Sequence, residues 1–381
     1  MTVPPGDGHH PAPGADATYS RVAELPLSIE RCELLPLARD TSSGFTKIST
    51  VVRLTGDGHE GLGEDITWDQ IDQIEHLRHA GELSWLRGRR TVDEFSTLLG
   101  LADLFPVEPI RDSAREYRRW AFESASLDLA LRQNGLSLQD AVGRVAQPVS
   151  FVVSMRIADH AGLDPLRALR SMDPGLRFKL DPTPGWDREL LAELGSLACV
   201  DVVDMKGLYR NASVAMEPDP DLYLRVFEGL PRAWIEDPAV DDRTIELLEH
   251  HRDRITWDQP IHSVGDIEVL PWQPRLLNLK PARFGSVRRL FETYDYCAAH
   301  GIGAYGGGMF EQGPGRGQLQ YLASLFHPDG PNDLAPVSYN LQIDGGDLPR
   351  SPLPPEPHPT GFRWGSYDRR RSIRERLPAP R

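Results

Sequence analysis

The stretch at 176–205, LRFKLDPTPGWDRELLAELGSLACVDVVDM, decides the fold class because its pattern recurs through the second half of the chain. The apolar run at 176–181 is typical of a buried strand, and the segment at 187–197 has the periodicity of a helix. A second apolar run follows at 200–205. Equivalent runs, separated by helical segments, lie at 150–155, 233–237, 255–259, 276–280 and 301–307.

Strand–helix alternation at this spacing indicates parallel βα units. Seven units in succession predict an α/β fold, a modified (β/α) barrel of the TIM type with seven to eight units. A doubly wound open sheet is the alternative arrangement. No Gly-x-Gly-x-x-Gly motif follows the first run, which favours the barrel.

The first third of the chain has a different pattern. Alternating apolar and polar residues at 21–65, with a turn at Gly56-Asp57-Gly58, predict a short antiparallel sheet. Helical periodicity follows at 69–135, and the small residues Ala121, Ser124 and Ala125 predict close packing against another element. We expect four segments: a flexible tail at 1–20, an α+β capping domain at 21–146, a barrel catalytic domain at 147–345, and a C-terminal segment at 346–381 that returns to the capping domain or is disordered.

Composition excludes several classes of partner. The net charge of −14 argues against nucleic acid or an anionic membrane, and we expect the basic run at 369–371 to be a solvated tail. The three cysteines are too few and too widely spaced for a disulfide framework or a CxxC metal site. No apolar run approaches the roughly 20 residues of a membrane span, and residues 1–20 lack the core of a signal peptide. A cytoplasmic protein is expected.

One charged residue stands at the end of each of five consecutive predicted strands. The residues are, in order, Lys179, Asp204, Glu236, Asp258 and Lys280, separated by 25, 32, 22 and 22 residues. The active sites of (β/α) barrels lie at the carboxyl ends of the strands, so a ring of these side chains around the barrel mouth is expected.

Three carboxylates that converge on one point repel each other unless a cation shares the site. The sequence therefore predicts that Asp204, Glu236 and Asp258 bind Mg²⁺, with Mn²⁺ as a substitute. Lys179 and Lys280 are then expected on opposite sides of the metal, with Arg177 lowering the pKa of Lys179. A metal-held carboxylate between two lysines suits removal of the proton on the carbon next to that carboxylate.

Simpler interpretations exist for each residue. A lysine at a strand end can be a surface residue, and a carboxylate there can cap the following helix. Asp181 competes for the role of the first metal ligand, but then the strand at 200–205 is left without one, so Asp204 is favoured. We expect Asp181 to cap the next helix or to support the metal site, and Asp237 to face solvent or act as a cap.

In these motifs the chain resembles the enolase superfamily, in the branch that includes muconate cycloisomerase, o-succinylbenzoate synthase and dipeptide epimerase. RFK resembles the K-x-K motif of the second barrel strand, and VDMKG, WIEDP, WDQP and LNLKPARFG resemble the metal-ligand and sixth-strand motifs. GDGHEGLGE (56–64), AFESASLDLALRQNGLSLQDAVG (121–143) and GGGMFEQGPGRGQLQYLASL (306–325) resemble a capping hairpin, the helix before the barrel and the end of the seventh strand. The resemblance also implies a homo-oligomer.

Two residues depart from this branch. Arg177 replaces the first lysine of K-x-K and cannot itself act as a base, and Lys206 stands where the branch has asparagine. We expect Lys206 to bind substrate or to weaken the metal site. Further substrate contacts are expected from Asn278, Glu311 and two capping loops that include Phe45 and Trp68, although Glu311 is equally suited to anchoring its glycine-rich loop.

The resemblance implies a Mg²⁺-dependent enzyme that abstracts the proton α to a carboxylate of a small molecule through an enediolate. The reaction is a racemisation or epimerisation, a cycloisomerisation or a syn-dehydration. Two alternatives stay open: an acid-sugar dehydratase of the same superfamily, and a metal-binding barrel without turnover. A histidine base of the mandelate racemase type is disfavoured, since the seventh predicted strand has no histidine.

Overall fold

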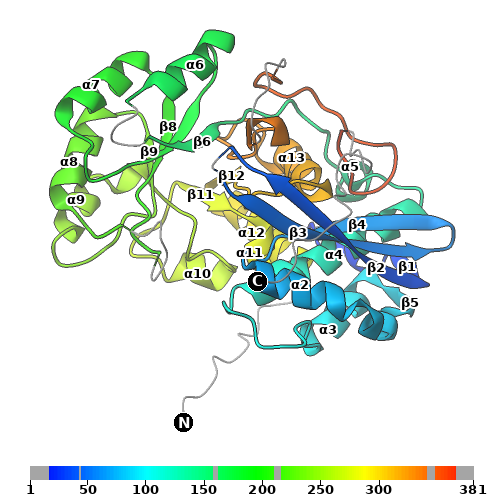
Figure 1. The fold of residues 1–381 in the computed structure, drawn as a ribbon. Helices are drawn as coiled ribbons and strands as arrows, with labels where there is room; N and C mark the ends of the chain where they lie inside the picture. The colour runs from blue at the N-terminus through cyan, green and yellow to red at the C-terminus, as the bar shows by residue number, and fades with distance from the viewer. Residues whose placement is uncertain (1–16, 43, 158–161, 210–215, 341–347, 366–381) are drawn as a thin grey trace.

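The computed structural model describes residues 17–42, 44–157, 162–209, 216–340 and 348–365. In Figure 1 a capping module (blue to cyan) lies on the right, and the helices that follow the first barrel strands (green) lie on the left. The later barrel elements (yellow to orange) lie between them. The barrel elements and the capping module together form the expected α/β barrel with an α+β capping domain, so the predicted fold class is confirmed.

The capping module is built on a three-stranded antiparallel sheet in the order β2-β3-β4. Gly56 pairs with His59, so the turn between β3 and β4 contains only Asp57 and Gly58, and both have positive φ angles. Such two-residue hairpins match the twist of their strands. The three strands are β2 (Arg31–Asp40), β3 (Thr46–Gly56) and β4 (His59–Asp65).

Helix α4 (Ala114–Gln133) packs directly on β4, as its small residues predicted. A Cβ atom on Gly61 would lie 2.1 Å from the carbonyl oxygen of Ala125, and one on Gly63 would lie 1.9 Å from that of Ala121. Glycine on the strand and small residues on the helix therefore allow a backbone approach that larger residues would block. The other elements of the module are α1 (Ser20–Ala23), β1 (Pro26–Ile29), α2 (Gln70–Arg78), a 3-10 helix (Ala80–Leu86), β5 (Gly88–Thr91), α3 (Val92–Leu101) and α5 (Leu138–Val142).

The barrel contains all seven predicted strands in one parallel sheet, ordered β12-β11-β10-β9-β8-β7-β6. The five inner strands are short and largely buried, as expected for a sheet covered by helices, whereas the edge strands β6 and β12 are partly exposed. The strands are β6 (Val153–Arg156), β7 (Phe178–Asp181), β8 (Val200–Asp204), β9 (Trp234–Glu236), β10 (Ile255–Trp257), β11 (Leu276–Leu279) and β12 (Gly303–Gly306). The helices are α6 (Asp164–Met172), α7 (Arg188–Leu197), α8 (Pro220–Gly229), α9 (Ile245–His250), α10 (Val264–Glu268), α11 (Pro281–Phe284), α12 (Val287–Ala299) and α13 (Pro314–Phe326).

A two-residue segment joins the edge strands β6 and β12. Asn332 bridges to Phe151, just before β6, and Asp333 bridges to Gly307, just after β12. The backbone amide of Val152 donates to the carbonyl of Asn332 at 2.8 Å, and that of Asp333 donates to Gly306 at 2.8 Å. This segment takes the place of an eighth strand and carries Asp333 to the barrel mouth.

The expected tail is ordered from residue 17 onwards. The backbone amide of Thr18 donates to Asp295 at 2.8 Å and Tyr19 is buried, so residues 17–20 are not tail, which is a correction. Residues 1–16 lie outside the described part. Near the other end, Arg363 donates to Asp128 of α4 at 2.8 Å. The basic run at 369–371 lies outside the described residues, and the domain boundaries stay a prediction.

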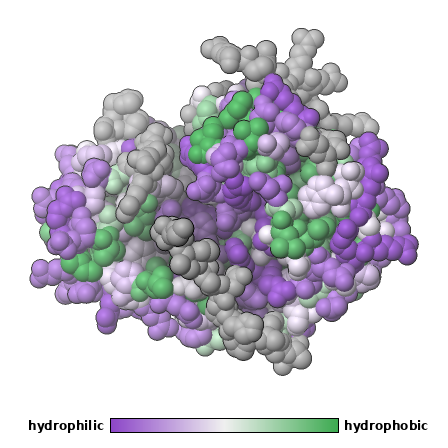
Figure 2. Space-filling model, turned by 90° about the horizontal axis from the view of Figure 1, so that it is seen from below, coloured by the Kyte–Doolittle hydropathy of each residue, from purple (hydrophilic) through white to green (hydrophobic). Residues whose placement is uncertain are grey.

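The surface seen in Figure 2 is mostly hydrophilic, with apolar side chains in separate small groups and a hollow near its centre. The apolar residues are instead concentrated inside, in a large cluster that runs through the barrel and a smaller one between α3, α4 and the capping sheet. Among the described residues, no helix has the length and apolar character required to cross a membrane.

Candidate active site

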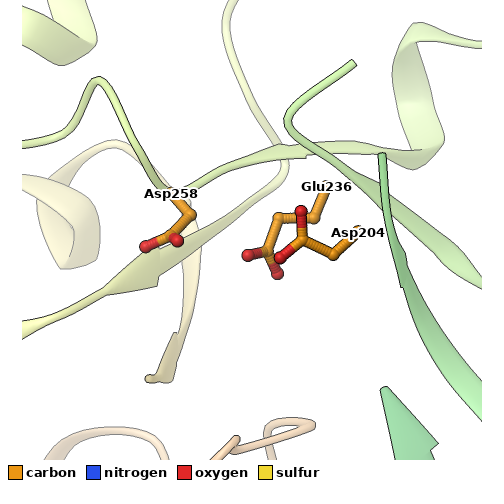
Figure 3. A group of neighbouring side chains, drawn as sticks. All are labelled: Asp204, Glu236 and Asp258. Atoms are coloured by element: carbon orange, nitrogen blue, oxygen red, sulfur yellow. The ribbon is translucent and has the colours of Figure 1, made fainter. Parts of the chain in front are cut away.

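Three buried carboxylates meet at the ends of three neighbouring strands, as Figure 3 shows. Asp204 ends β8, Glu236 ends β9 opposite it in the parallel ladder, and Asp258 follows β10. Each residue contributes one carboxylate oxygen to a group in which all lie within 4.8 Å of one another. The even spacing in the sequence therefore becomes a compact acidic triad.

The side chains around the triad carry an excess of negative charge that a divalent cation would neutralise. Six carboxylates gather here, Asp181, Asp204, Glu236, Asp237, Asp258 and Asp333, against four cationic side chains, Lys179, Lys206, Lys280 and Arg283. Burial and the neighbouring carboxylates raise the pKa of Glu236 well above its usual range. The Oδ1 atom of Asp258 has no hydrogen-bond partner among the described residues. An oxygen-rich, electron-rich site of this kind fits Mg²⁺.

Lys179 lies below the triad on β7 and is almost completely buried. Its Nζ atom donates to Glu236 Oε1 at 2.5 Å and lies 3.1 Å from Asp204 Oδ2 and 3.7 Å from Asp333 Oδ2. Burial alone would lower the pKa of Lys179, but Glu236 and Asp204 outweigh it and raise the pKa. Lys179 is therefore held as a cation among three carboxylates.

Lys280 lies at the other end of the triad. Its Nζ atom is 2.9 Å from Asp258 Oδ2. Its alkyl chain passes directly over Gly307, where a Cβ atom would lie 2.5 Å from Lys280 Cε. The predicted arrangement, with lysines at both ends of an acidic triad, is present in the structure.

The structure corrects the role that was expected for Arg177. Its guanidinium pairs with Asp201 and donates to the carbonyl of Ala198 at 3.0 Å, before β7 begins. It is half-exposed, and the pKa of Lys179 is set mainly by burial, Glu236 and Asp204. Arg177 precedes β7, which begins at Phe178, and its partner Asp201 is the residue of β8 that is skipped in the pairing of β7 with β8.

Lys206 lies just outside the triad. Its ammonium group donates to Asp204 Oδ2 and lies 3.6 Å from Asp181 Oδ1. Asp181 does not cap the next helix, because Asp187 accepts the capping hydrogen bond from Leu190 at 2.9 Å. Asp181 therefore supports the site through Lys206, the second of its two expected roles.

Asp237 is also a correction, since it is completely buried. Its carboxylate accepts from the backbone amides of Asp258 at 2.8 Å and Gln259 at 2.9 Å. Burial and the nearby Asp258 raise its pKa to about 7. Asp237 thus fixes the backbone that presents the third carboxylate of the triad.

The expected substrate contacts fall into two groups. Asn278 lies in the site: its amide donates to Glu236 Oε1 at 3.2 Å, and its Oδ1 has no partner among the described residues. Glu311 instead anchors its own loop, accepting from the backbone amide of Met309 at 2.9 Å and pairing with Arg316. These contacts agree with the alternative role expected for Glu311, which is to anchor its glycine-rich loop.

Phe45 and Trp68 of the capping loops form an aromatic trio with Phe310, which follows β12. The ring centroids lie 5.7 Å apart for Phe45 and Trp68, 5.4 Å for Phe45 and Phe310, and 6.0 Å for Trp68 and Phe310. Lys47 lies over the Trp68 ring, 4.7 Å from its centroid. The trio joins the capping module to the loop beyond the seventh strand.

Four residues of the site were not anticipated from the sequence. Tyr305 of β12 donates to Glu236 Oε2, and Arg283 and Tyr209 lie 3.1 and 3.3 Å from Asp258 Oδ2. Arg283 stands three residues after Lys280 in LNLKPARFG, so its proximity could have been inferred from helical spacing. Asp333 gave no signal, because its segment is too short to appear as a strand.

The complete sequence contains only four lysines, against 38 arginines. Lys179, Lys206 and Lys280 contact the triad, and Lys47 is buried against the Trp68 ring. Arginine is always charged, whereas a lysine amine is compact and can lose its proton. Three of the four lysines thus contact the triad, together with Arg283.

Comparison with known proteins places the chain in a family. A family model described as "Domain of unknown function (DUF8230) C-terminal domain" matches residues 145–341, and the corresponding N-terminal domain model matches residues 20–141. The chain belongs to this family. It is also 28% identical over 350 residues to an N-succinylamino acid racemase of Thermus thermophilus, covering 86% of this chain and 88% of that protein. An o-succinylbenzoate synthase of Bacillus subtilis is 27% identical over 268 residues, 64% of this chain and 70% of that protein.

Solved structures share the fold of this DUF8230 protein. A member of the enolase superfamily from Listeria innocua superposes with a TM-score of 0.67 at 22% identity, over 84% of this chain and 88% of that one. A dipeptide epimerase from Methylococcus capsulatus, complexed with a Mg ion, gives a TM-score of 0.59 at 22% identity, over 85% and 92% of the two chains. The expected resemblance to the enolase superfamily is confirmed.

Proposed function

We propose that this DUF8230 protein is a Mg²⁺-dependent enzyme that removes the proton α to the carboxylate of a small molecule. The observation that carries the proposal is the buried triad Asp204–Glu236–Asp258 with lysine ammonium groups at both ends. Asp204, Glu236 and Asp258 would hold the metal. When bound, Mg²⁺ supplies positive charge to the substrate carboxylate and to the enediolate formed from it.

The chain's own residues supply the proton transfer. Lys280 approaches from the Asp258 end, and a lysine of the β7–β8 side approaches from the other; the sequence assigns Lys179 to that second position. Removal of the α-proton by one lysine in its neutral form and delivery of a proton from the ammonium group of the other, on the opposite face, inverts the α-carbon. If a hydroxyl group stands on the neighbouring carbon, the same abstraction can instead lead to its departure as water, with a lysine ammonium group supplying the proton to the hydroxyl.

An amino-acid derivative with an apolar group is the proposed substrate class. The aromatic trio of Phe45, Trp68 and Phe310 offers an apolar surface on the capping side, which suits such a group better than a sugar acid. The similarity to an N-succinylamino acid racemase supports the same class. An acid-sugar dehydratase is therefore the weaker candidate.

The test is deuterium incorporation. N-succinyl and other N-acyl amino acids, dipeptides and sugar acids are incubated separately with protein and Mg²⁺ in D₂O, and mass gain at the α-carbon is measured. The proposal expects incorporation with an N-acyl amino acid, lost with EDTA, lost for one of the two enantiomers in Lys280→Met, and retained for both in the matched control Arg177→Gln. Absence of incorporation into every acid would favour a metal-binding barrel without turnover.

A further inference from the structure

We propose that Glu64 of the capping module is a positioning residue for substrate selectivity, because it fixes the loop at 307–313 that carries Phe310. This inference rests on the proposed function and adds to it a residue that acts through Phe310 rather than by touching the substrate. Two sequence motifs meet at this point. GDGHEGLGE (56–64) ends at Glu64, and GGGMFEQGPGRGQLQYLASL (306–325) contains the loop and the start of α13.

The carboxylate of Glu64 takes the place of an N-cap side chain for α13. Gly313, the N-cap residue, has no side chain, and Pro314 has no amide hydrogen. The backbone amide of Gln312 donates to Glu64 Oε1 at 2.8 Å. Those of Gly313 and Gly315 donate to Oε2 at 2.9 and 3.1 Å. Amides at a helix start lack partners within the helix and favour a negative charge, so one carboxylate satisfies the whole turn.

The site of Glu64 is buried and closely fitted. Burial raises the pKa of Glu64 and Glu311 raises it further, while hydrogen bonds from Gln312 and from the Ser49 hydroxyl, at 2.8 Å, oppose the rise. A Cβ atom on Gly315 would lie 2.9 Å from Glu64 Oε2, so glycine leaves the space that the carboxylate fills. A buried carboxylate is costly unless it is fully hydrogen-bonded. The contact therefore depends on both the charge of Glu64 and the complete set of donors.

The conformation of Phe310 depends on how the loop is held. Its φ angle is +63°, in the left-handed region that a bulky residue adopts only where its surroundings impose it. On one side of Phe310, the amide of Met309 donates to Glu311 Oε2 at 2.9 Å. On the other side, the amide of Gln312 is held by Glu64 at 2.8 Å. Release of the Glu64 contact would free this second side and let the Phe310 ring leave the aromatic trio.

The other end of the loop is held without Glu64. Gly307, which lies against Lys280, directly follows β12. The next amide, that of Gly308, donates to the carbonyl of Asp333 at 3.1 Å. Loss of the Glu64 contact is therefore expected to change the apolar surface that binds substrate and to leave Lys280 in place. The two effects separate in kinetics, since the first alters KM and the second would alter kcat.

The main experiment measures α-deuterium exchange of N-succinylphenylalanine and N-succinylalanine in wild type and Glu64→Gln. Glutamine has the same size, but it has no charge and only one of its terminal atoms accepts hydrogen bonds. KM for the phenylalanine compound is expected to rise about 10-fold, the value of one aromatic contact, with kcat nearly unchanged. KM for the alanine compound should stay at its wild-type value. Glu60→Gln is the matched control, because Glu60 lies on the same strand and pairs with Arg53 and Arg363.

An unchanged KM for the phenylalanine compound in Glu64→Gln would overturn the assignment. An equal change for both compounds, or a loss of kcat with KM unchanged, would overturn it as well, because general damage to the fold does not select between side chains. If Glu64→Gln does not fold, Gly315→Ala disturbs the same contact from the side of α13, since its Cβ would lie 2.9 Å from Glu64 Oε2. That variant should then show the same loss of selectivity.

A second experiment needs no substrate. Amide hydrogen exchange of wild type and Glu64→Gln is followed by peptide mass spectrometry. Peptides that contain the amides of Gln312 and Gly313 are expected to exchange about 10-fold or more faster in the variant, because each loses a hydrogen bond to a charged group, while peptides of α4 keep their rate. Equal rates at 312–313 in the two proteins would overturn the assignment. If wild type exchanges neither substrate, the proposed function fails, and this measurement still decides whether Glu64 fixes the loop.

Discussion

The backbone of Gly307 lies directly against the side chain of Lys280, and a Cβ atom at position 307 would come within 2.5 Å of Lys280 Cε. The same Cβ would lie 2.5 Å from Asn278 Oδ1. Gly307 therefore determines where the amine of Lys280 stands relative to Asp258. The φ angle of Gly307 is not positive, so the backbone conformation does not require glycine here. Glycine contributes to the site only by the absence of a side chain.

Gly307→Ala is expected to displace Lys280 and to lower the rate of α-proton exchange by about 100-fold, the usual cost of moving a reacting group by about 1 Å. The measurement is the exchange rate in D₂O. Gly265→Ala is the matched control, since a Cβ there meets only an ordinary contact, 3.7 Å from Ser263 Oγ. Wild-type exchange in Gly307→Ala would contradict the account of Lys280.

Mg²⁺ is expected to stabilise the protein as well as to support exchange. At a hundredfold excess over its dissociation constant, a ligand bound only by the native state raises the free energy of unfolding by about 2.7 kcal/mol. Thermal or urea unfolding with and without Mg²⁺ measures this. Glu236→Gln should lose the Mg²⁺-dependent increase, because it removes one ligand charge, and an equal increase in that variant would argue against the triad as the metal site.

Low pH is expected to destabilise the protein through His327, which contacts the segment that joins β6 and β12. Burial lowers the pKa of His327 to about 4, while its Nδ1 lies 2.7 Å from Oδ1 of Asn332, the residue that bridges toward β6. The histidine is neutral in the native state and takes up a proton more readily when unfolded. Its stabilising contribution is therefore complete above about pH 6.5 and falls by up to about 3 kcal/mol as the pH drops toward 4.

This pH effect is measured by urea unfolding of wild type and His327→Gln between pH 7.5 and 4.5. The variant loses the hydrogen bonds of the imidazole at every pH, but it does not take up the extra proton on unfolding. The difference in unfolding free energy between the two proteins should therefore shrink as the pH falls. A constant difference would show that His327 does not titrate in this way.

Trp68→Ala is expected to weaken substrate binding by removing part of the aromatic trio. KM should rise by about 10-fold, corresponding to loss of one aromatic contact surface, with a smaller change in kcat. Trp85→Ala is the matched control: Trp85 is 37% exposed, like Trp68 at 39%, and stands outside the trio. An equal change in KM in both variants would show that the trio does not contact substrate.

Arg177→Gln is expected to leave the exchange rate and its pH dependence unchanged, since the guanidinium pairs with Asp201 and Ala198 away from Lys179. Removal of a half-exposed ion pair should lower the free energy of unfolding by about 1 kcal/mol or less. A shifted pH–rate profile would restore the role that the sequence suggested for Arg177.

The sequence predicted the barrel because buried parallel strands appear as short, continuous apolar runs. It also predicted the triad, since Asp204, Glu236 and Asp258 each stand at the end of such a run. It could not predict the closing segment: Asn332 and Asp333 form single bridges to β6 and β12, without any apolar run. Close contacts between segments far apart in the chain leave no local pattern.

The roles of the basic residues were harder to assign for a different reason. Arg177 and Lys179 are two residues apart, which places side chains on one face of a regular strand. Arg177, however, precedes β7 and pairs with Asp201, the residue skipped in the β7–β8 register, and the positive φ of Lys206 turns the chain where β8 ends. Such local backbone features decide which partners these basic side chains meet, and they are not visible in composition or spacing.

The most direct test of the central claim is α-deuterium incorporation into an N-acyl amino acid by wild-type protein in D₂O with Mg²⁺. The account predicts one deuterium at the α-carbon, abolished by EDTA and by Asp258→Asn and retained in Arg177→Gln. Incorporation that persists without a divalent cation, or in Asp258→Asn, would contradict metal-assisted proton abstraction at this site.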